Sequence, residues 1–174
     1  EGEFKEGVFN GQGTYIWPDG KKYFGEFSDG EKTGQGRYSD PFGEEYVGEF
    51  MDSNYHGQGT IIWSDAREYE GEWVNGKRTG FGIFTDINGD MYEGMHKEGL
   101  KHGHGTYTEF EGVKYEGEWE NGEVYVKVSY ILEDGSKYKG ERKYGKFHGI
   151  GKLTLPDGDI YEGKFKDGKR NGQG

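Results

Sequence analysis

The chain has 174 residues with 30% hydrophobic residues, against about 45% or more in ordinary domains, and its 35 glycines are roughly three times the usual share. A core large enough to enclose an enzyme pocket is therefore not expected, and a net charge of -11 disfavours nucleic acid as a partner. The absence of cysteine excludes disulfides and thiolate metal sites. No apolar run reaches the ~18 residues of a transmembrane helix.

A tyrosine recurs every 23 residues along the whole chain, without insertion or deletion. A glycine stands two positions after each tyrosine, and an aromatic residue usually stands at the fourth position, where His96 and Arg142 depart from the pattern. The chain starts and ends within a unit, so we expect residues 1–174 to form one array of about seven and a half units from a longer protein. The tyrosines are Tyr23, Tyr46, Tyr69, Tyr92, Tyr115, Tyr138 and Tyr161.

A second half-motif, Gly-x-Gly followed by an apolar residue, completes each unit and fails only at Val126 and Val128. Asp-Gly or Asn-Gly pairs separate the half-motifs, as at 29–30 and 75–76, and a second series precedes the next tyrosine, as at 19–20 and 88–89. Such pairs between short alternating runs are strong hairpin signals, because Asn and Gly tolerate positive φ. We therefore expect two short strands per unit in an antiparallel meander.

Alternation along a strand predicts where the rings lie. Tyr69, Gly71 and Trp73 would point to one face and the intervening glutamates to the other, solvated face. In the partner strand Gly80, Gly82 and Phe84 would share one face. We predict that the rings of one strand lie over the glycines of its neighbour, which have no side chain to obstruct them.

These residues resemble the MORN family, whose repeat runs Tyr-x-Gly-x-aromatic, a short turn, then Gly-x-Gly-x-apolar, over the whole chain. The resemblance implies an all-β fold: an elongated, twisted antiparallel meander, a single-layer β-hairpin repeat array. It also implies a scaffold for protein interactions, commonly dimeric. The expected location is cytoplasmic, including cytoskeletal, ciliary or membrane-associated sites. Phosphoinositide binding has been proposed for the family as well.

We expect a non-catalytic scaffold or adapter that holds a protein partner or peptide segment on its aromatic face or groove and forms a homodimer. Exposed rings such as Tyr92 and Trp119 would anchor the partner, because aromatic residues and Arg dominate interface energetics. The segment around Val126 and Val128, which lacks the paired glycines, is the candidate for self-association, and a tolerated irregular repeat is the competing interpretation. The predicted partner face comprises Tyr69, Trp73, Tyr92, His96, Tyr115, Trp119, Tyr138 and Arg142, and the self-association segment comprises Tyr125, Val126, Val128, Tyr130 and Ile131.

The alternative function is a phosphoinositide- or acidic-membrane-binding adapter that uses cations of the hairpin turns. Ordinary solvated turn residues are the competing interpretation, as the overall acidity favours. These cations are Lys77, Arg78, Lys97, Lys101, Lys169 and Arg170.

Other functions find less support in the sequence. A carbohydrate-binding aromatic platform stays open, although the regular glycines indicate rings packed on the chain itself. His96, His102 and His104 are close in sequence, but the repeat period explains His102 as a member of a polar column, so no metal site and no cofactor are predicted. A second irregularity, Ser53-Asn54-Tyr55, lacks a turn glycine.

Overall fold

The computed structural model describes residues 1–112, 114–124, 128–143 and 146–172. Over these residues the chain is all-β, with no helix, so no helix there is long and apolar enough to cross a membrane. The predicted antiparallel meander with two strands per repeat is confirmed. The strands are β1 (Gly2–Lys5), β2 (Val8–Ile16), β3 (Lys22–Ser28), β4 (Glu31–Ser39), β5 (Glu45–Met51), β6 (Asn54–Ile62), β7 (Glu68–Val74), β8 (Lys77–Thr85), β9 (Met91–Lys97), β10 (Leu100–Thr108), β11 (Lys114–Glu120), β12 (Glu123–Val124), β13 (Val128–Ile131), β14 (Lys137–Lys143), β15 (Lys146–Thr154), β16 (Ile160–Lys166) and β17 (Lys169–Arg170).

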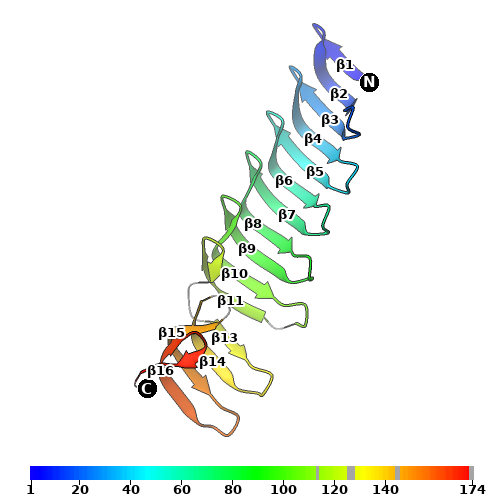
Figure 1. The fold of residues 1–174 in the computed structure, drawn as a ribbon. Helices are drawn as coiled ribbons and strands as arrows, with labels where there is room; N and C mark the ends of the chain where they lie inside the picture. The colour runs from blue at the N-terminus through cyan, green and yellow to red at the C-terminus, as the bar shows by residue number, and fades with distance from the viewer. Residues whose placement is uncertain (113, 125–127, 144–145, 173–174) are drawn as a thin grey trace. The chain divides into compact units, whose positions relative to one another are not determined.

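Within each sheet the strands pair in chain order, as Figure 1 shows. Strands β1 to β12 form one sheet in chain order, and β13 to β17 form a second. The chain also divides into two compact units. The first unit comprises Glu1–Gly89 and His96–Gly99, and the second comprises Asp90–Met95 and Leu100–Gly174. Both units are built from the same hairpin repeat.

One edge of the sheet carries the tight turns between the two half-motifs. Asp29 and Gly30 have φ of 50° and 84°, and Asn75 and Gly76 have φ of 48° and 75°, as the predicted Asn-Gly and Asp-Gly turns require. Ser53 replaces the glycine at φ 63°. Its hydroxyl accepts a hydrogen bond from the Lys32 amide at 3.1 Å and donates one to Glu31, which accounts for this irregularity.

The turns at the opposite edge have a different conformation, although they carry the same Asp-Gly or Asn-Gly signal. Gly20 has φ of 90° while Asp19 is not in the positive region. The Gly20 amide donates to the Trp17 carbonyl at 2.9 Å, and the Asp19 carboxylate accepts a hydrogen bond from the Lys21 amide. The dipeptide alone therefore did not distinguish these longer turns from the tight ones at the other edge.

The core is a row of tyrosine rings lying on glycines, as predicted. A Cβ added at Gly82 would lie 2.4 Å from the Tyr69 hydroxyl and 2.5 Å from its ring, and the same holds at Gly59 beneath Tyr46. Trp73 lies in the same layer and donates its indole N–H to the Gly59 carbonyl at 3.0 Å. A single layer of strands can thus bury large rings because the glycines bring each ring against the backbone itself.

The predicted face of Gly80 is wrong, because a β-bulge interrupts the alternation there. The register passes from Gly71 opposite Gly82 to Glu72 opposite Thr79, and Gly80 has φ of 53°. A Cβ at Gly80 would meet the Glu72 carboxylate at 2.2 Å. That carboxylate accepts a hydrogen bond from the Phe81 amide at 3.2 Å, and Glu49 does the same for Gln58 at 2.9 Å. These glutamates have a structural role that their interpretation as a solvated face did not include.

Candidate interaction face

The aromatic face is the side of the sheet that carries the rings of the Tyr-x-Gly motifs. In the first unit the hydroxyls of the repeat tyrosines are engaged within the chain. Each donates to the carbonyl three residues further on, from Tyr23 to Glu26 at 3.0 Å, from Tyr46 to Glu49 at 2.9 Å and from Tyr69 to Glu72 at 3.1 Å. Tyr115 in the second unit donates to the Glu109 carboxylate instead. Tyr23, Tyr46 and Tyr69 are 0% exposed. The floor of this face is therefore apolar ring surface whose hydroxyl donors are already used.

In six of the seven repeats the residue nine positions after the repeat tyrosine covers its ring with an aromatic residue or a cation, whereas Val124 stands at this position after Tyr115. Tyr55 stacks on Tyr46 with ring centroids 3.8 Å apart, and in the second unit Phe147 stacks on Tyr138 at the same distance. In other repeats a cation takes this place. Such cation–ring contacts contribute about 0.5 to 2 kcal/mol, depending on desolvation. The cation-to-centroid distances are 5.6 Å for Lys32 over Tyr23, 5.5 Å for Arg78 over Tyr69, 5.1 Å for Lys101 over Tyr92 and 5.1 Å for Arg170 over Tyr161.

The predicted partner-binding residues lie on the aromatic face, but the expectation that Tyr92 and Trp119 are exposed anchors is wrong. Tyr92 is 0% and Trp119 9% exposed. The Tyr92 ring lies against Gly94 and Gly105, and the Trp119 indole N–H donates to the Gly105 carbonyl at 3.2 Å. The rest of the predicted set except Arg142, which is half-buried, is buried as well. Whether this set binds a partner stays a prediction. Its buried members are Tyr69, Trp73, His96, Tyr115 and Tyr138.

Two members of that set replace an aromatic residue and occupy its place. His96 packs edge-on against Tyr69 with ring centroids 5.0 Å apart in the first unit. In the second unit the Arg142 guanidinium lies 4.7 Å from the centroid of the Tyr115 ring. A flat polar group therefore substitutes for a ring in this column, which is why both departures from the repeat pattern are compatible with the fold.

Half-exposed rings also line the aromatic face, and among them Trp17 and Trp63 were not identified from the sequence. In the first unit Trp17, Tyr38, Trp63 and Phe84 lie at the C-terminal ends of strands or just after them. Tyr55 lies at the start of β6 and stacks on Tyr46. Trp17 and Tyr38 have centroids 6.3 Å apart, and Trp63 and Phe84 are 6.1 Å apart. Tyr38 and Phe84 stand at the apolar position of the second half-motif, whereas Trp17 and Trp63 stand outside both motifs, in a column of mixed chemistry. The half-exposed rings packed against the core of this unit are Phe9, Trp17, Tyr38, Tyr55, Trp63 and Phe84.

Charges on this face alternate with the repeats of the first unit. The Lys32 ammonium lies 5.4 to 5.7 Å from four ring centroids, and burial lowers the pKa of Lys32. In the next repeat burial, and then Asp40, raise the pKa of Glu44. Burial, and then Glu44, also raise the pKa of Tyr55. The repeat after that is cationic again, with the Arg78 guanidinium 4.9 Å from the Phe84 centroid.

The second unit has its own charged contacts on this face. The Lys101 ammonium lies 4.3 Å from the Tyr107 centroid and 4.9 Å from that of Trp119. The Tyr107 hydroxyl donates to Asp90 at 2.6 Å, which holds the pKa of that carboxyl below its usual range together with the Phe110 amide. Cations, carboxylates and rings are thus interleaved in this unit as well.

Three of the six cations proposed for lipid binding are not simple solvated turn residues. Arg78, Lys101 and Arg170 lie over tyrosine rings, and Arg78 also donates to the Gly99 carbonyl at 2.5 Å. Lys77 pairs with the exposed Glu98. Lys97 and Lys169 are exposed. Lipid binding through these residues stays a prediction.

The three histidines of residues 96–104 are not gathered into a site. His96 is buried on the aromatic face, whereas His104 is exposed between Glu116 and Glu118, at 3.1 and 3.4 Å. Among the described residues no group of His, Asp and Glu has the arrangement of a metal site.

The predicted self-association segment is only partly described. Tyr125 and Val126 lie outside the described residues, and for Val128 and Tyr130 only the strand backbone is described, within β13. Ile131 is 61% exposed at the end of that strand. Self-association of this segment stays a prediction.

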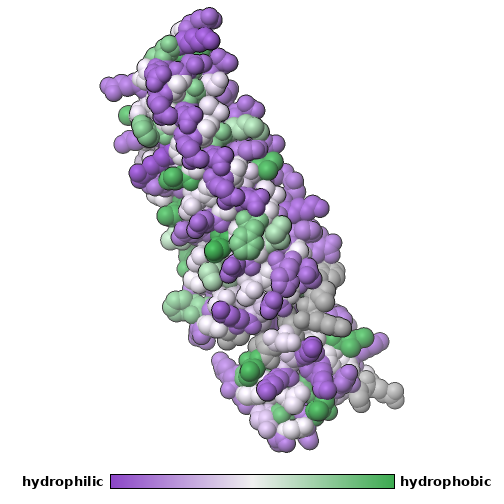
Figure 2. Space-filling model, turned by 180° about the vertical axis from the view of Figure 1, so that it is seen from behind, coloured by the Kyte–Doolittle hydropathy of each residue, from purple (hydrophilic) through white to green (hydrophobic). Residues whose placement is uncertain are grey.

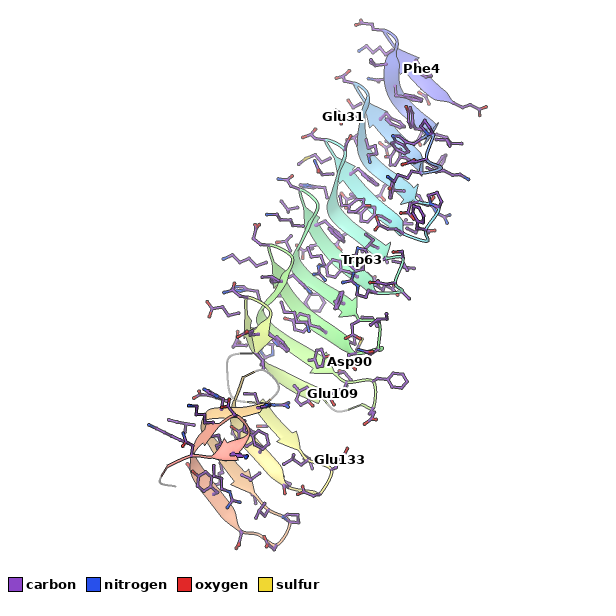
Figure 3. The ribbon with its side chains drawn as sticks, viewed as in Figure 1. Phe4, Glu31, Trp63, Asp90, Glu109 and Glu133 are labelled. Carbon is purple, nitrogen blue, oxygen red and sulfur yellow. The ribbon has the colours of Figure 1, made fainter. Side chains whose placement is uncertain are left out.

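The surface seen from behind in Figure 2 is mostly hydrophilic, with hydrophobic residues in small separate groups. On the face opposite the tyrosines, Phe24 and Val47 are exposed between polar neighbours. Figure 3 places Glu31 and Trp63 at opposite edges of the sheet, so Trp63 lies away from the edge with the tight polar turns.

A family model described as MORN repeat matches eight segments of the chain: residues 1–22, 23–41, 46–65, 69–91, 92–108, 115–123, 138–160 and 161–174. The chain belongs to the MORN-repeat family. MORN repeats are non-catalytic modules generally associated with protein or membrane-lipid interaction. The resemblance read from the tyrosine and glycine columns is therefore confirmed.

No curated protein sequence matches the chain. Among solved structures, the SAS-4 TCP domain in complex with a proline-rich motif of Ana2 of Drosophila melanogaster is 9% identical, with 88% of this chain and 90% of that chain covered and a TM-score of 0.40. Virginiamycin B lyase from Staphylococcus aureus is 15% identical over 90% of this chain and 56% of its own, with a TM-score of 0.19. Streptogramin B lyase is 13% identical over 92% and 71%, with a TM-score of 0.21. Likeness at these scores carries no argument about function.

Proposed function

We propose that this MORN array is a non-catalytic interaction scaffold that holds a segment of a protein partner on its aromatic face. The observation that carries the proposal is the group of half-exposed rings, which includes Trp17, Tyr38, Tyr55, Trp63 and Phe84, packed on a floor of buried tyrosines. Rings that are already ordered by packing lose little entropy on binding, and Trp and Tyr are the residues that most often dominate interface energetics.

The face also carries charge that a partner can pair with. Lys32 and Arg78 are half-buried among rings, where a partner carboxylate would meet a partly desolvated cation. An interaction of that kind is stronger than one between fully solvated charges. Apolar contact and charge pairing together support a protein segment over a purely apolar ligand.

A peptide library displayed on phage tests the proposal. Peptides selected on the wild-type array are expected to lose at least about tenfold in affinity on Trp63→Ala, since removal of an interface Trp commonly costs 1 to 2 kcal/mol or more. The matched control is Phe24→Ala, which removes an exposed ring from the opposite face. Thermal melts of both variants show whether the fold is retained. Selected peptides that are insensitive to Trp63→Ala, or that depend on Phe24, would place binding elsewhere.

Self-association and a cytoplasmic, cytoskeletal, ciliary or membrane-associated location belong to the same proposal. A scaffold gains avidity when two arrays present their faces together. Light scattering with small-angle X-ray scattering at several protein concentrations measures the solution mass directly. A mass of one chain at every concentration would remove the homodimer from the proposal and leave the partner-binding face unaffected.

A further inference from the structure

On the aromatic face of the first unit, the same types of side chain recur in every second repeat and not in every repeat. Trp17 and Trp63 stand 46 residues apart, as do Lys32 and Arg78. The repeat between them has Asp40 where these repeats have tryptophan, and Tyr55 where they have a cation. Two cationic sites therefore flank an acidic one.

The two cationic sites have the same construction. At the first site Lys32 lies 5.7 Å from the Trp17 ring and 5.5 Å from the Tyr38 ring. At the second site Arg78 lies 5.8 Å from the Trp63 ring and 4.9 Å from the Phe84 ring. All of these side chains are half-exposed, so a second molecule can reach each cation from the open side of its rings.

The acidic site consists of Asp40 and Glu44 beside Tyr55. Asp40 is held in place because its carboxylate accepts hydrogen bonds from the amides of Phe42 and Glu44, at 2.8 and 3.0 Å. The Glu44 side chain is half-buried, and the Tyr55 ring next to it is fixed by its stack on Tyr46. The site therefore presents negative charge at a defined place between the two cations.

The spacing of the three sites follows from the sheet. Neighbouring strands lie about 4.8 Å apart, so one repeat of two strands advances about 10 Å along the face. Opposite charges thus alternate about every 10 Å. We propose that the occupant of this face is an α-helix of a protein partner that carries an acidic, a basic and an acidic residue at seven-residue spacing. This inference rests on the proposed function and adds the chemistry of the partner.

A helix fits this spacing for two physical reasons. Seven residues of α-helix rise about 10.5 Å and return to nearly the same face, whereas three residues of a β-strand span about 10 Å but reverse the face. A polyproline segment would return its side chains at a similar spacing, but it leaves its backbone groups in need of partners. The hydroxyls of Tyr23, Tyr46 and Tyr69 are used within the chain, while a helix satisfies its own backbone.

The test uses two designed helical peptides of equal length and zero net charge. One carries Glu, Lys and Glu at seven-residue spacing on its apolar side, and the other carries Lys, Glu and Lys there, with balancing charges on the far side. Calorimetry against the 174-residue chain is expected to give at least tenfold tighter binding for the first peptide. Equal affinities, tighter binding of the second peptide, or no binding of either up to about 1 mM, a very weak affinity, would overturn the proposal.

Charge exchange at the acidic site provides the matched variant. Glu44→Lys is expected to weaken binding of the first peptide at least tenfold. The same variant should favour binding of a version of that peptide whose central Lys is replaced by Glu. The control is Glu70→Lys, an exposed glutamate on the opposite face. If Trp63→Ala abolishes binding but Glu44→Lys does not, the face binds helices without this charge register, so the inference fails and the proposed function stands. If neither variant changes peptide binding, or if the chain binds only anionic vesicles of phosphatidylserine and phosphatidylcholine, both this inference and the proposed function fail.

Discussion

Tyr46 and Tyr69 occupy equivalent positions in successive repeats, yet their rings are covered by different chemistry. Tyr55 stacks on Tyr46 at 3.8 Å, whereas the Arg78 guanidinium lies 5.5 Å from the Tyr69 centroid. Both tyrosines are fully buried and both donate to the carbonyl three residues on. The comparison shows that the repeat requires a cover for each ring but leaves its chemistry free, so that function can vary without loss of the fold.

The largest expected effect is loss of the fold at alkaline pH, because both kinds of covered tyrosine must stay neutral. Burial raises the pKa of Tyr23 and Tyr92 to about 12, and that of Tyr69 to about 12 although Arg78 opposes the increase. The folded pKa lies above the unfolded value near 10, so this stability is complete below pH 10 and declines as the pH rises toward 12. Each tyrosine contributes about 1.4 kcal/mol per pH unit in that window.

The measurement is a circular-dichroism titration combined with tyrosinate absorbance. Cooperative unfolding that coincides with tyrosine ionisation between pH 10 and 12 is expected. Arg78→Gln removes the cation that opposes the raised pKa of Tyr69 and leaves Tyr46 with its own cover. If tyrosines ionise near pH 10 with the fold retained, their burial in the native state would be contradicted.

The next largest effect is expected from a methyl group beneath a tyrosine ring. Gly59→Ala would place its Cβ 2.2 Å from the Tyr46 hydroxyl and 2.5 Å from its ring, with no room to relax. We expect a loss of about 3 kcal/mol or more in the free energy of unfolding. Gly43→Ala, at a turn where no atom lies within 4 Å, is expected to cost only about 1 kcal/mol from its φ of 100°. Urea denaturation of both variants decides, and equal losses would argue against ring-on-glycine packing.

Replacement of Tyr55, the residue that covers the Tyr46 ring, tests whether an aromatic cover and a cationic cover are interchangeable. Tyr55→Ala uncovers the Tyr46 ring and is expected to cost about 2 kcal/mol, since a half-buried stacked ring is lost. Tyr55→Lys restores a cover of the other kind and should recover about half of that loss through cation–ring contact. Thermal denaturation compares the two variants with the wild type. If Tyr55→Lys is as unstable as Tyr55→Ala, the two covers are not interchangeable.

The smallest effect is expected on the opposite face, where the glutamates do not contact the rings. Glu72→Ala removes the acceptor for the Phe81 amide and should cost about 1 kcal/mol. Glu70→Ala, exposed on the same face, should change stability by less than about 0.5 kcal/mol. Equal values in chemical denaturation would mean that the bulge does not depend on its carboxylate.

The structure also shows why part of the candidate site escaped prediction. The buried tyrosines were predictable because a 23-residue column of identical residues marks them, but identity in a column signals packing and not exposure. Trp63 and Arg78 stand in columns of mixed chemistry, which carry no repeat signal. Trp63 and Arg78 come into contact because the Arg78 side chain extends from its own strand to the rings of a neighbouring hairpin.

By itself the sequence determined the family, the two strands per repeat and the placement of rings over glycines, because local turn chemistry and a strict period fix all three. Only the tertiary structure decided that Tyr92 and Trp119 are buried, that a bulge removes Gly80 from the ring layer and that Lys32 and Arg78 lie among rings. The physical reason is that exposure and cation–ring distance depend on how successive hairpins pack together. The pattern within a single strand does not contain that information.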